Sequence, residues 1–452
     1  MTKPQVAIIG GGFTGLTAAL QLLDQGVQPI VLEQDSQPGG LAGSFEVNGA
    51  ELEKFYHHWF KSDLHIHDLV KRLGLENEIL YRKTKTGSYY ANSLFRLSRP
   101  LDLLAYTPLS LIGRIRLGLL VFQARAVKDW RTIEDETAAN WLLRMCGTEV
   151  FERVWKPLLN GKFGKFADEI GAVWMWNKLA LRGGSRDKSG EEVLAYYKGG
   201  FAQLSKAMMA RIIERGGEVR LNTSVTGLTV EGGKVTGVVT SNGPVAADSV
   251  LSTLPQPVFA SIVAPHVEAA YVEQLRRIEY LGNVCMVLEL QKSLSDTYWI
   301  NVADPEFPFV GVIEHTNFEP TETYGGRHIV YLSKYLPTDA PMYGYNPAEM
   351  VEFALPHLQR MFPDFRREWI LDAHVFRSEY TQPIVKPGYS RLIPDAQTPV
   401  AGLWQCSMAQ IYPEDRGTNY AVREGFKIGK RIADSLAGRG GAGAPKLEKV
   451  AV

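Results

Sequence analysis

The N-terminal stretch carries the pattern that most constrains this chain. A hydrophobic run, QVAIIG, leads into a glycine-rich turn, then into TGLTAALQLLDQG, whose apolar residues recur at helical spacing, and then into PIVLE. This order predicts a buried parallel strand, a helix and a second parallel strand. Three glycines of the turn, Gly10, Gly12 and Gly15, fit G-x-G-x-x-G. A strand and helix joined in this way are typical of a dinucleotide-binding unit.

Each part of the turn has a physical role. The first glycine permits the tight turn, the second lets the backbone approach a pyrophosphate, and the third lets helix and strand pack closely. The N–H groups and positive dipole end of the helix then face the phosphates. Glu33 ends the second strand, where its carboxylate can accept hydrogen bonds from a ribose and disfavours a 2′-phosphate. We therefore expect a bound dinucleotide, and this pattern alone leaves NAD and FAD open.

Length and charge set further bounds. At 452 residues the chain is long enough for two or more domains. Lys plus Arg and Asp plus Glu are equal at 49 each, so nucleic acid is not an expected partner. Three scattered cysteines, Cys146, Cys285 and Cys406, give neither a disulfide framework nor metal-ligand spacing. No signal peptide is recognisable at the N-terminus. We expect a cytoplasmic protein.

Beyond Glu33 the chain resembles the FAD-binding amine oxidase superfamily, which includes monoamine oxidases, protoporphyrinogen oxidases, phytoene desaturases and, more distantly, UDP-galactopyranose mutases. A second glycine-rich loop, QPGGLAGS, and three later blocks carry the resemblance in the family's order. The blocks are VWKPLLNGKFGKFADEIGA (154–172), the segment from YYKGGFAQL to KVTGVV (196–239), and VAGLWQCSMAQIYPEDRGTNYAVREGFKIGKRIA (400–433). The resemblance implies that the cofactor is FAD. It also implies noncovalent binding, because YTQPIVKPGYSRLIP, before the last block, has no cysteine.

The resemblance places the cofactor contacts in the two glycine-rich loops, at the end of the second strand, in one later strand and at the start of the closing helix. The helix N-terminus there would stabilise a reduced, anionic flavin ring. Relatives end the closing strand in Gly-Asp or Gly-Glu, but this chain reads GLWQCSMAQ, so Asp415 or Glu414 would have to replace that carboxylate. The predicted contacts are Gly10, Gly12, Phe13, Thr14, Gly15, Glu33, Gln34, Gly40, Leu41, Ala42, Val225, Asp415, Gly417, Thr418 and Asn419.

The predicted fold class is α/β, with a Rossmann-type FAD-binding domain built on a parallel sheet and a mixed substrate domain. Because distant segments must meet at one nucleotide, the FAD domain is expected to be discontinuous. The alternating strands of the substrate domain indicate a mostly antiparallel sheet as the floor of a pocket, with helices as its roof. The expected boundaries are 1–70, 196–255 and 395–437 for the FAD domain, 71–195 for the helices, 256–394 for the antiparallel sheet and 438–452 for a disordered tail.

The segment EKFYHHWFKSDLHIHD (53–68) is rich in histidine. His57 and His58 are the candidate catalytic residues, because they follow the glycine-rich loop as a histidine-containing stretch does in the mutases. The alternative is a structural pair, hydrogen-bonded beneath the pocket. Metal binding is a third reading, but the spacing of Glu53, His57, Asp63, His65 and His67 matches no recognised ligand pattern, so no metal is predicted.

Other residues are candidates for the substrate pocket. Lys162, Lys165 and Arg182 would contact an anionic substrate and would otherwise be solvated surface. An aromatic pocket or an aromatic core would use Trp155, Trp174, Trp176, Tyr196 and Tyr197.

Three functions remain open at this point. The leading one is an FAD-dependent oxidase or desaturase that removes a hydride from an apolar or cyclic small molecule, and the match at 154–172 favours it. The second is a non-redox nucleotide-sugar mutase that uses reduced flavin as a nucleophile. The third is a flavoprotein that serves as an assembly or redox-partner module. The sequence names neither the substrate, the electron acceptor nor the oligomeric state.

The leucine-rich segment 101–130 is too interrupted to span a membrane. Its leucines either bury themselves as a roof over the pocket or make weak peripheral contact with the inner face of a membrane, with Arg114, Arg116 and Arg125 at the headgroups. We favour burial, and we expect a mainly soluble protein with a small-molecule substrate as its partner.

Overall fold

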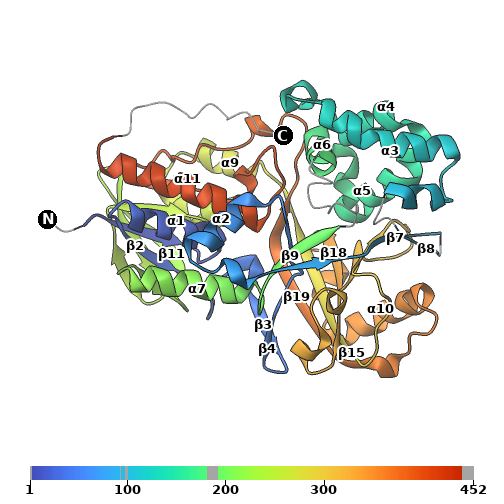
Figure 1. Ribbon diagram of the computed structural model, residues 1–452. Helices are drawn as coiled ribbons and strands as arrows, with labels where there is room; N and C mark the ends of the chain where they lie inside the picture. Colours follow the sequence, from blue (N-terminus) through green and yellow to red (C-terminus); the bar gives the residue numbers. More distant parts are fainter. Residues whose placement is uncertain (1–2, 92, 97–99, 181–191, 440–452) are drawn as a thin grey trace.

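The computed structural model describes residues 3–91, 93–96, 100–180 and 192–439 (Figure 1). Arg182 and most of the tail 438–452 lie outside these residues. Two halves lie side by side in Figure 1, one with α1, α7 and α11, the other with α3–α6 and α10.

A five-stranded parallel sheet forms the centre of the first half, with strand order β10-β2-β1-β14-β20. Its strands come from distant parts of the chain: β1 (Gln5–Ile9), β2 (Gln28–Leu32), β10 (Glu218–Arg220), β14 (Ser249–Ser252) and β20 (Leu403–Gln405). The predicted α/β class and the parallel sheet are confirmed.

Alternate residues of β1 enter two different cores, as the period of two in a strand requires. Val6 and Ile8 pack into the core that also contains residues of α1 (Phe13–Asp24), α7 (Phe201–Glu214) and α11 (Thr418–Leu436). Ala7 and Ile9 enter a core on the opposite face. That face is covered by the meander β11 (Val225–Glu231), β12 (Lys234–Thr240) and β13 (Gly243–Ala246), with α8 (Gln256–Val263) and α9 (Ala269–Arg276) beside it.

Two glycines bring α11 against α1. A Cβ on Gly425 would lie 2.7 Å from the Thr14 carbonyl oxygen, and one on Gly429 would lie 2.9 Å from the Ala18 carbonyl oxygen. Backbones can approach this closely only where side chains are absent. The two helices, side by side in Figure 1, are therefore held in one fixed register.

A seven-stranded sheet forms the floor of the second half, in the order β19-β15-β18-β17-β16-β7-β8. Val284 and Met286 of β15 pack toward α10 (Pro347–Met361), whereas Cys285 and Val287 face the core of the first half. Every pairing is antiparallel except β16 with β7. The strands are β7 (Thr86–Tyr90), β8 (Ser93–Arg96), β15 (Tyr280–Leu290), β16 (Trp299–Val302), β17 (Gly311–Glu314), β18 (His328–Leu336) and β19 (Ile370–Pro383).

The part expected to be helical, 71–195, differs from that expectation at both ends. It supplies β7 and β8 to the large sheet and β6 and β9 to a small antiparallel sheet, β5-β9-β6. Short alternating runs such as TGSYY can complete a sheet edge without a long apolar stretch, which is why composition alone did not separate them from helix. The bounds are β5 (Trp59–Phe60), β6 (Ile79–Lys83) and β9 (Val193–Tyr197), and the hairpin β3 (Ser44–Val47) and β4 (Ala50–Glu53) lies nearby with α2 (Leu64–Arg72).

Between those ends lies a helical layer with its own core. It contains α3 (Leu111–Ala126), α4 (Ala138–Val150), α5 (Lys156–Phe163) and α6 (Ala172–Ala180), and a π-helical turn at Phe151–Trp155 joins α4 to α5. Figure 1 shows α5 and α6 on the side of this layer that faces the rest of the molecule.

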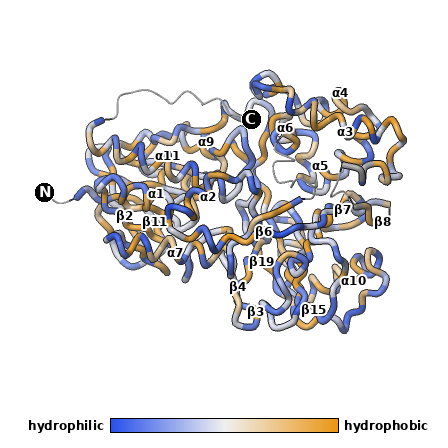
Figure 2. The backbone as a smooth tube through the Cα atoms, viewed as in Figure 1, coloured by the Kyte–Doolittle hydropathy of each residue, from blue (hydrophilic) through white to orange (hydrophobic). Residues whose placement is uncertain are grey.

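The expected burial of the leucine-rich segment is wrong for one face of α3. Leu120 is fully buried, and Leu117 packs against the helical core. Five other side chains are half or more exposed and follow one helical face, namely Leu111, Ile112, Ile115, Leu119 and Phe122, with exposed fractions of 50–68%. Figure 2 shows the hydrophobic colouring along α3. Among the described residues, no helix combines the length and apolarity needed to cross a membrane.

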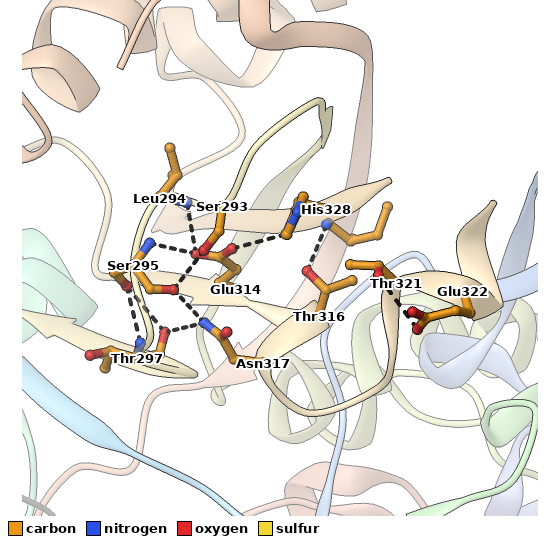
Figure 3. Close-up of polar contacts among 11 residues, drawn as sticks. Ser293, Leu294, Ser295, Thr297, Glu314, Thr316, Asn317, Thr321, Glu322 and His328 are labelled. Carbon is orange, nitrogen blue, oxygen red and sulfur yellow. Dashed lines mark hydrogen bonds and ion pairs between the residues drawn. The ribbon is translucent and has the colours of Figure 1, made fainter. Parts of the chain in front are cut away.

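A buried carboxylate closes the end of β17 (Figure 3). Glu314 is 2% exposed and accepts hydrogen bonds from the backbone N–H groups of Leu294 (3.1 Å) and Ser295 (2.9 Å). His328 Nδ1 lies 3.6 Å from its other oxygen. Burial raises the pKa of Glu314 to about 7. This group fastens the loop between β15 and β16 and takes no part in the site below.

Candidate active site

The first glycine-rich turn forms an open cradle at the start of α1. Gly10 has φ +107°, and a Cβ on Gly15 would lie 2.1 Å from the Gly10 carbonyl oxygen, so both positions require glycine. A Cβ on Gly12 would meet only the Cα of Gly40, at 4.0 Å. No side chain caps the N-terminus of α1. The N–H groups of its first turn, which includes Phe13 and Thr14, are thus available to a phosphate.

The second glycine-rich loop packs directly against the first. Gly39 N–H donates to the Gly11 carbonyl over 2.9 Å. Gly40 has φ +59°, and a Cβ there would lie 3.4 Å from the Cα of Gly12. Gly40, Leu41 and Ala42 form a short 3-10 turn, in which Ala42 is buried. The structure therefore brings these predicted contacts beside the cradle.

Glu33 lies at the end of β2, next to the cradle. It is 7% exposed, and its carboxylate accepts hydrogen bonds from the N–H groups of Gly11 (2.6 Å) and Asp35 (3.0 Å). Burial raises its pKa. Gln34 is exposed one residue further on, and Val225 opens β11. These positions suit a ribose and an adenine extending from the phosphates.

The N-terminus of α11 is, after that of α1, the second helix N-terminus at the site that no side chain caps. Gly417 occupies the N-cap position without a side-chain cap, and a Cβ there would meet nothing within 4 Å. Thr418 Oγ1 accepts a hydrogen bond from Trp59 Nε1 (2.9 Å), and Asn419 Oδ1 accepts one from Ile66 N (3.1 Å). Both side chains accept in these bonds, so the Thr418 hydroxyl and the Asn419 amide nitrogen remain donors for a cofactor, beside the backbone N–H groups. Figure 1 shows this end of α11 pointing at the junction of the two halves.

The predicted histidine pair lies close to that end, since Trp59 follows it directly in the chain. His57 Nδ1 lies 2.6 Å from the Phe55 carbonyl oxygen, and His58 Nδ1 lies 3.1 Å from Tyr298 Oη. Burial lowers the pKa of His57 to about 4 and that of His58 to about 3. Both rings are therefore neutral near pH 7, a state that suits a positioning role better than proton donation.

The third reading of the histidine segment, a metal site, gains no support from the geometry. Within the described ranges, the acidic and imidazole groups that approach closely enough to share an ion are Glu289, Asp372 and His374, and none lies in 53–68. The Arg327 guanidinium already pairs with Glu289.

The predicted aromatic residues separate into two groups, although all five are buried. Trp176 Nε1 donates to the Ala124 carbonyl (2.8 Å), and Tyr196 Oη donates to Glu53 (2.7 Å), as core residues do. In contrast, Trp155 Nε1 and Trp174 Nε1 are buried and have no hydrogen-bond acceptor among the residues that the structure describes. Buried donors of this kind usually have a partner, so water or a ligand is expected to supply the acceptor.

A charged cluster lies next to Trp174. Lys178 of α6 forms a 2.5 Å ion pair with Asp415, and Arg416 Nη2 donates to Tyr335 Oη on β18 over 2.8 Å. Lys162 of α5 has its Nζ 4.8 Å from the centroid of the Tyr335 ring and 5.2 Å from that of Trp174. The cluster therefore joins the helical layer, the large sheet and the segment leading into α11.

Burial and mutual charge set the protonation of this cluster. Burial lowers the pKa of Lys162 to about 8. Burial would raise the pKa of Asp415, but the charges of Lys178, Lys162 and Arg416 outweigh it and hold that pKa below its ordinary value. The same balance lowers the pKa of Tyr335, where Arg416 and Lys162 outweigh burial.

The sequence had indicated only part of this cluster. Lys162 and Asp415 were singled out, the first for an anion and the second for the cofactor, but Lys178, Tyr335 and Arg416 were missed. The available signal for Arg416 was its position directly before Gly417. Of the other candidates, Lys165 is exposed, which agrees with its alternative as solvated surface, and Glu414 pairs with Arg423 (2.7 Å), so it is not free for the expected contact.

Comparison with known proteins gives a consistent result. A family model described as flavin-containing amine oxidoreductase matches residues 13–426. Zeta-carotene desaturase of Capsicum annuum is 25% identical over 315 residues, which cover 62% of this chain and 52% of that protein. Coproporphyrinogen III oxidase of Staphylococcus aureus is 24% identical over 293 residues, which cover 57% of this chain and 62% of that protein. The chain thus aligns with about half to two thirds of these relatives.

Solved structures share the fold over nearly the whole chain. Cyclohexylamine oxidase from Brevibacterium oxydans has a TM-score of 0.68 at 17% identity, covering 96% of this chain and 100% of that one. Reduced UDP-galactopyranose mutase has a TM-score of 0.69 at 15% identity, covering 97% and 94%. At these identities the likeness concerns the fold alone.

Proposed function

Because the chain belongs to the family of flavin-containing amine oxidoreductases, and is thus an FAD-dependent enzyme, we propose that it is an oxidase or desaturase acting on an apolar or cyclic small molecule. The coarse activity follows from the family. The substrate and the direction of hydride transfer, from substrate to flavin, are the proposal.

One observation carries this proposal: the uncapped N-terminus of α11 points at the junction where the helical layer meets the large sheet. The two glycine-rich loops fit the pyrophosphate, because a Cβ on Gly12 would occupy the space left open there. The flavin end of FAD would then lie against α11. Bound FAD would accept a hydride from the substrate at that place. Backbone N–H groups and the helix dipole at Gly417 and Thr418 would favour negative charge at that point.

The surrounding residues would exclude water and position the substrate. Tyr56 makes edge-to-face contacts with Trp299 (ring centroids 4.8 Å apart) and Tyr331 (6.1 Å). His58 joins this group through Trp299, at 5.5 Å. An aromatic wall of this kind suits a cyclic or polyene substrate. His57 and His58, both neutral, would position such a substrate, and no strong base is required when the flavin itself accepts the hydride.

Mixing the oxidised holoenzyme with candidate substrates in the absence of oxygen tests the proposal. The names of the relatives supply two probes, coproporphyrinogen III and zeta-carotene. Bleaching of the flavin absorption by either probe, with formation of the oxidised product, is the expected result. The mutase alternative has the fold likeness in its favour. If reduced enzyme isomerises UDP-galactopyranose while neither probe bleaches the flavin, the oxidase proposal is wrong.

We also propose that the enzyme makes peripheral contact with the inner face of the cytoplasmic membrane through the exposed face of α3. Five apolar side chains on one helical face are more than scattered surface residues. Segment 101–130 contains four basic residues, Arg114, Arg116, Arg125 and Lys128, against the two acids Asp102 and Asp129, so its net charge of +2 complements an anionic bilayer. From α4, Glu149 bonds to Ser110 and offsets part of that charge.

Flotation with anionic liposomes tests this contact. The wild type should float at low salt and less at high salt, because salt screens the arginines. A double Ile115→Ser, Phe122→Ser variant should stay in solution with its flavin spectrum unchanged. Ile213→Ser, which alters an isoleucine 52% exposed on α7, is the matched control and should float like the wild type. Equal flotation of all three proteins would exclude α3 as the contact. Leu117 and Leu120 are unsuitable test positions because they belong to the core.

A further inference from the structure

We propose that Lys162, Lys178 and Arg416 form a subsite for an acidic group of the substrate, a carboxylate or a phosphate. This inference rests on the proposed function, since it concerns the same site and names the substrate class. Such a subsite would favour cyclic substrates that carry an acidic group over pure hydrocarbons.

Lys162 is the central observation. Its ammonium has no hydrogen-bond acceptor and no ion-pair partner in the described parts of the chain, and its surroundings are the rings of Phe163, Trp174 and Tyr335. The Lys162 side chain is partly exposed, and an ammonium packed over aromatic rings keeps only part of its hydration, so an anion or an acceptor that replaces the lost water is favourable. The lowered pKa of Lys162 agrees with this, because desolvation by burial is its largest cause and outweighs the opposing charges of Tyr335 and Asp415.

Two further donors beside it also lack acceptors. Arg416 donates through Nη2 to Tyr335, but its Nε is buried and has no partner among the described residues. Trp174, over which the Nζ atoms of Lys162 and Lys178 both lie, has an unpartnered Nε1. All three unsatisfied groups are donors. A ligand that completes them must therefore bring acceptor oxygens.

The charges of the cluster point the same way. Lys162, Lys178 and Arg416 give three positive charges, and Asp415 is the carboxylate that accompanies them. Asp415 is already paired with Lys178 at 2.5 Å. Arg416 and Lys162 are left with the phenol of Tyr335, which is neutral when protonated. An anionic group would restore the balance and raise the pKa of Lys162 toward its ordinary value.

The position of the cluster favours the substrate over the cofactor as the source of that anion. Lys162 lies on α5, Lys178 on α6 and Tyr335 on β18, so the cluster spans the helical layer and the floor sheet. The phosphates of FAD belong to the glycine cradle at the start of α1. Asp415 and Arg416 precede the end of α11 that would meet the flavin, but Asp415 pairs with Lys178 and the Arg416 side chain bonds to Tyr335 on the floor.

Ligand binding to the FAD-loaded enzyme tests the subsite without turnover. The probes are two acid and neutral pairs that the oxidised enzyme does not consume: coproporphyrin III with its tetramethyl ester, and benzoate with benzamide. Binding is followed by probe fluorescence or by perturbation of the flavin spectrum. We expect at least one acid to bind more tightly than its neutral partner. Lys162→Met should weaken that acid about tenfold or more, the value of a lost charge-assisted hydrogen bond.

Lys165→Met is the matched control, because Lys165 lies three residues further along the chain and is exposed. It should bind every probe as the wild type does. The proposal is overturned if no acid binds better than its neutral partner, or if Lys162→Met leaves the preference unchanged. A Lys162→Met protein that loses FAD or shifts its flavin spectrum while keeping the acid preference would assign the lysine to the cofactor instead. Failure of the proposed oxidase activity would show separately, as the absence of flavin bleaching.

Discussion

The two halves of the molecule build their parts of the site by different means. In the half with the parallel sheet, the groups that would hold FAD are mostly backbone N–H groups at the starts of α1 and α11. Glycines leave these N–H groups uncovered, because they have no side chain to fill the space in front of them. In the other half, the polar groups are side chains such as Lys162, Lys178 and Tyr335, each from a different element. Ligand binding by backbone N–H groups is therefore blocked by any added side-chain atoms, whereas ligand binding by these side chains depends on their charge.

A valine at Gly12 should have the largest effect and tests the backbone half. Its Cβ would meet protein only at the Gly40 Cα, 4.0 Å away, and would fill the space for the pyrophosphate, so the chain should fold but bind FAD roughly a hundredfold or more weakly, as expected when two charge-assisted hydrogen bonds are lost. Flavin absorbance after purification and far-UV circular dichroism measure the two outcomes. Gly344→Val, where the added Cβ meets nothing within 4 Å, should keep its FAD. A Gly12→Val protein that is still yellow with bound flavin would contradict the view that this half binds FAD through its backbone.

An alanine at Gly425 should have the next largest effect. Its Cβ would lie 2.7 Å from the Thr14 carbonyl oxygen and from Thr17 Cβ, so α11 must shift away from α1. We expect the free energy of unfolding to fall by about 1–3 kcal/mol, as overpacking usually costs. Thermal unfolding measures it, with Lys430→Ala on the exposed side of α11 as the control. An unchanged midpoint for Gly425→Ala would mean that the two helices are not in fixed register.

The side-chain half should instead respond to pH. The pKa of Lys162 is about 8 in the free site, so its ammonium is present below that pH and is lost above it. Affinity for an acidic probe should therefore fall as pH rises beyond about 8, by at most about tenfold per unit. Tyr335, whose pKa is lowered, would act in the same direction. Lys162→Met separates the two, because it should flatten the part of the profile due to the lysine. A neutral probe should show no such fall in either protein.

The smallest expected effect lies outside both sites, at Glu314. Its folded pKa, about 7, is above the ordinary value of 4.5. Its contribution to stability is therefore most favourable below pH 4.5 and is lost as pH rises through 7. Between pH 6 and 8 this amounts to about 1 kcal/mol. Glu314→Gln keeps an acceptor for the N–H groups of Leu294 and Ser295, so denaturant unfolding should show a flatter pH dependence than in the wild type. An equally steep dependence would contradict the assignment.

The contrast between the halves also explains what could be predicted from the sequence. Gly10, Gly12, Gly15 and Glu33 could be predicted as cofactor contacts because a backbone cradle needs glycine at fixed spacing along one short segment. The parallel sheet followed from the same local signals and is confirmed. The predicted domain boundaries and contact residues stay predictions, although the structure brings the second loop and the start of α11 into suitable places.

The charged cluster could not be predicted because its geometry depends on contacts between segments far apart in the chain. Nothing in the sequence near Lys178 indicates that it meets Asp415, or that Tyr335 receives a hydrogen bond from Arg416. The face of α3 was misjudged for a related reason. Its leucines occur all around the helix, and only the packing of α4 and α6 decides that Leu120 is buried while Leu119 is exposed.

The order of the strands has a consequence for how the enzyme is made. Residues 10–15 leave the ribosome first, whereas β20 and α11 lie after residue 400. At roughly 5–20 residues per second, tens of seconds separate the synthesis of the phosphate cradle from that of the helix that would meet the flavin. Until α11 is made, a nascent chain would offer FAD the phosphate cradle alone. If both ends hold the cofactor, secure loading would follow the synthesis of α11, and a chain cut short before α11 would lack the second contact.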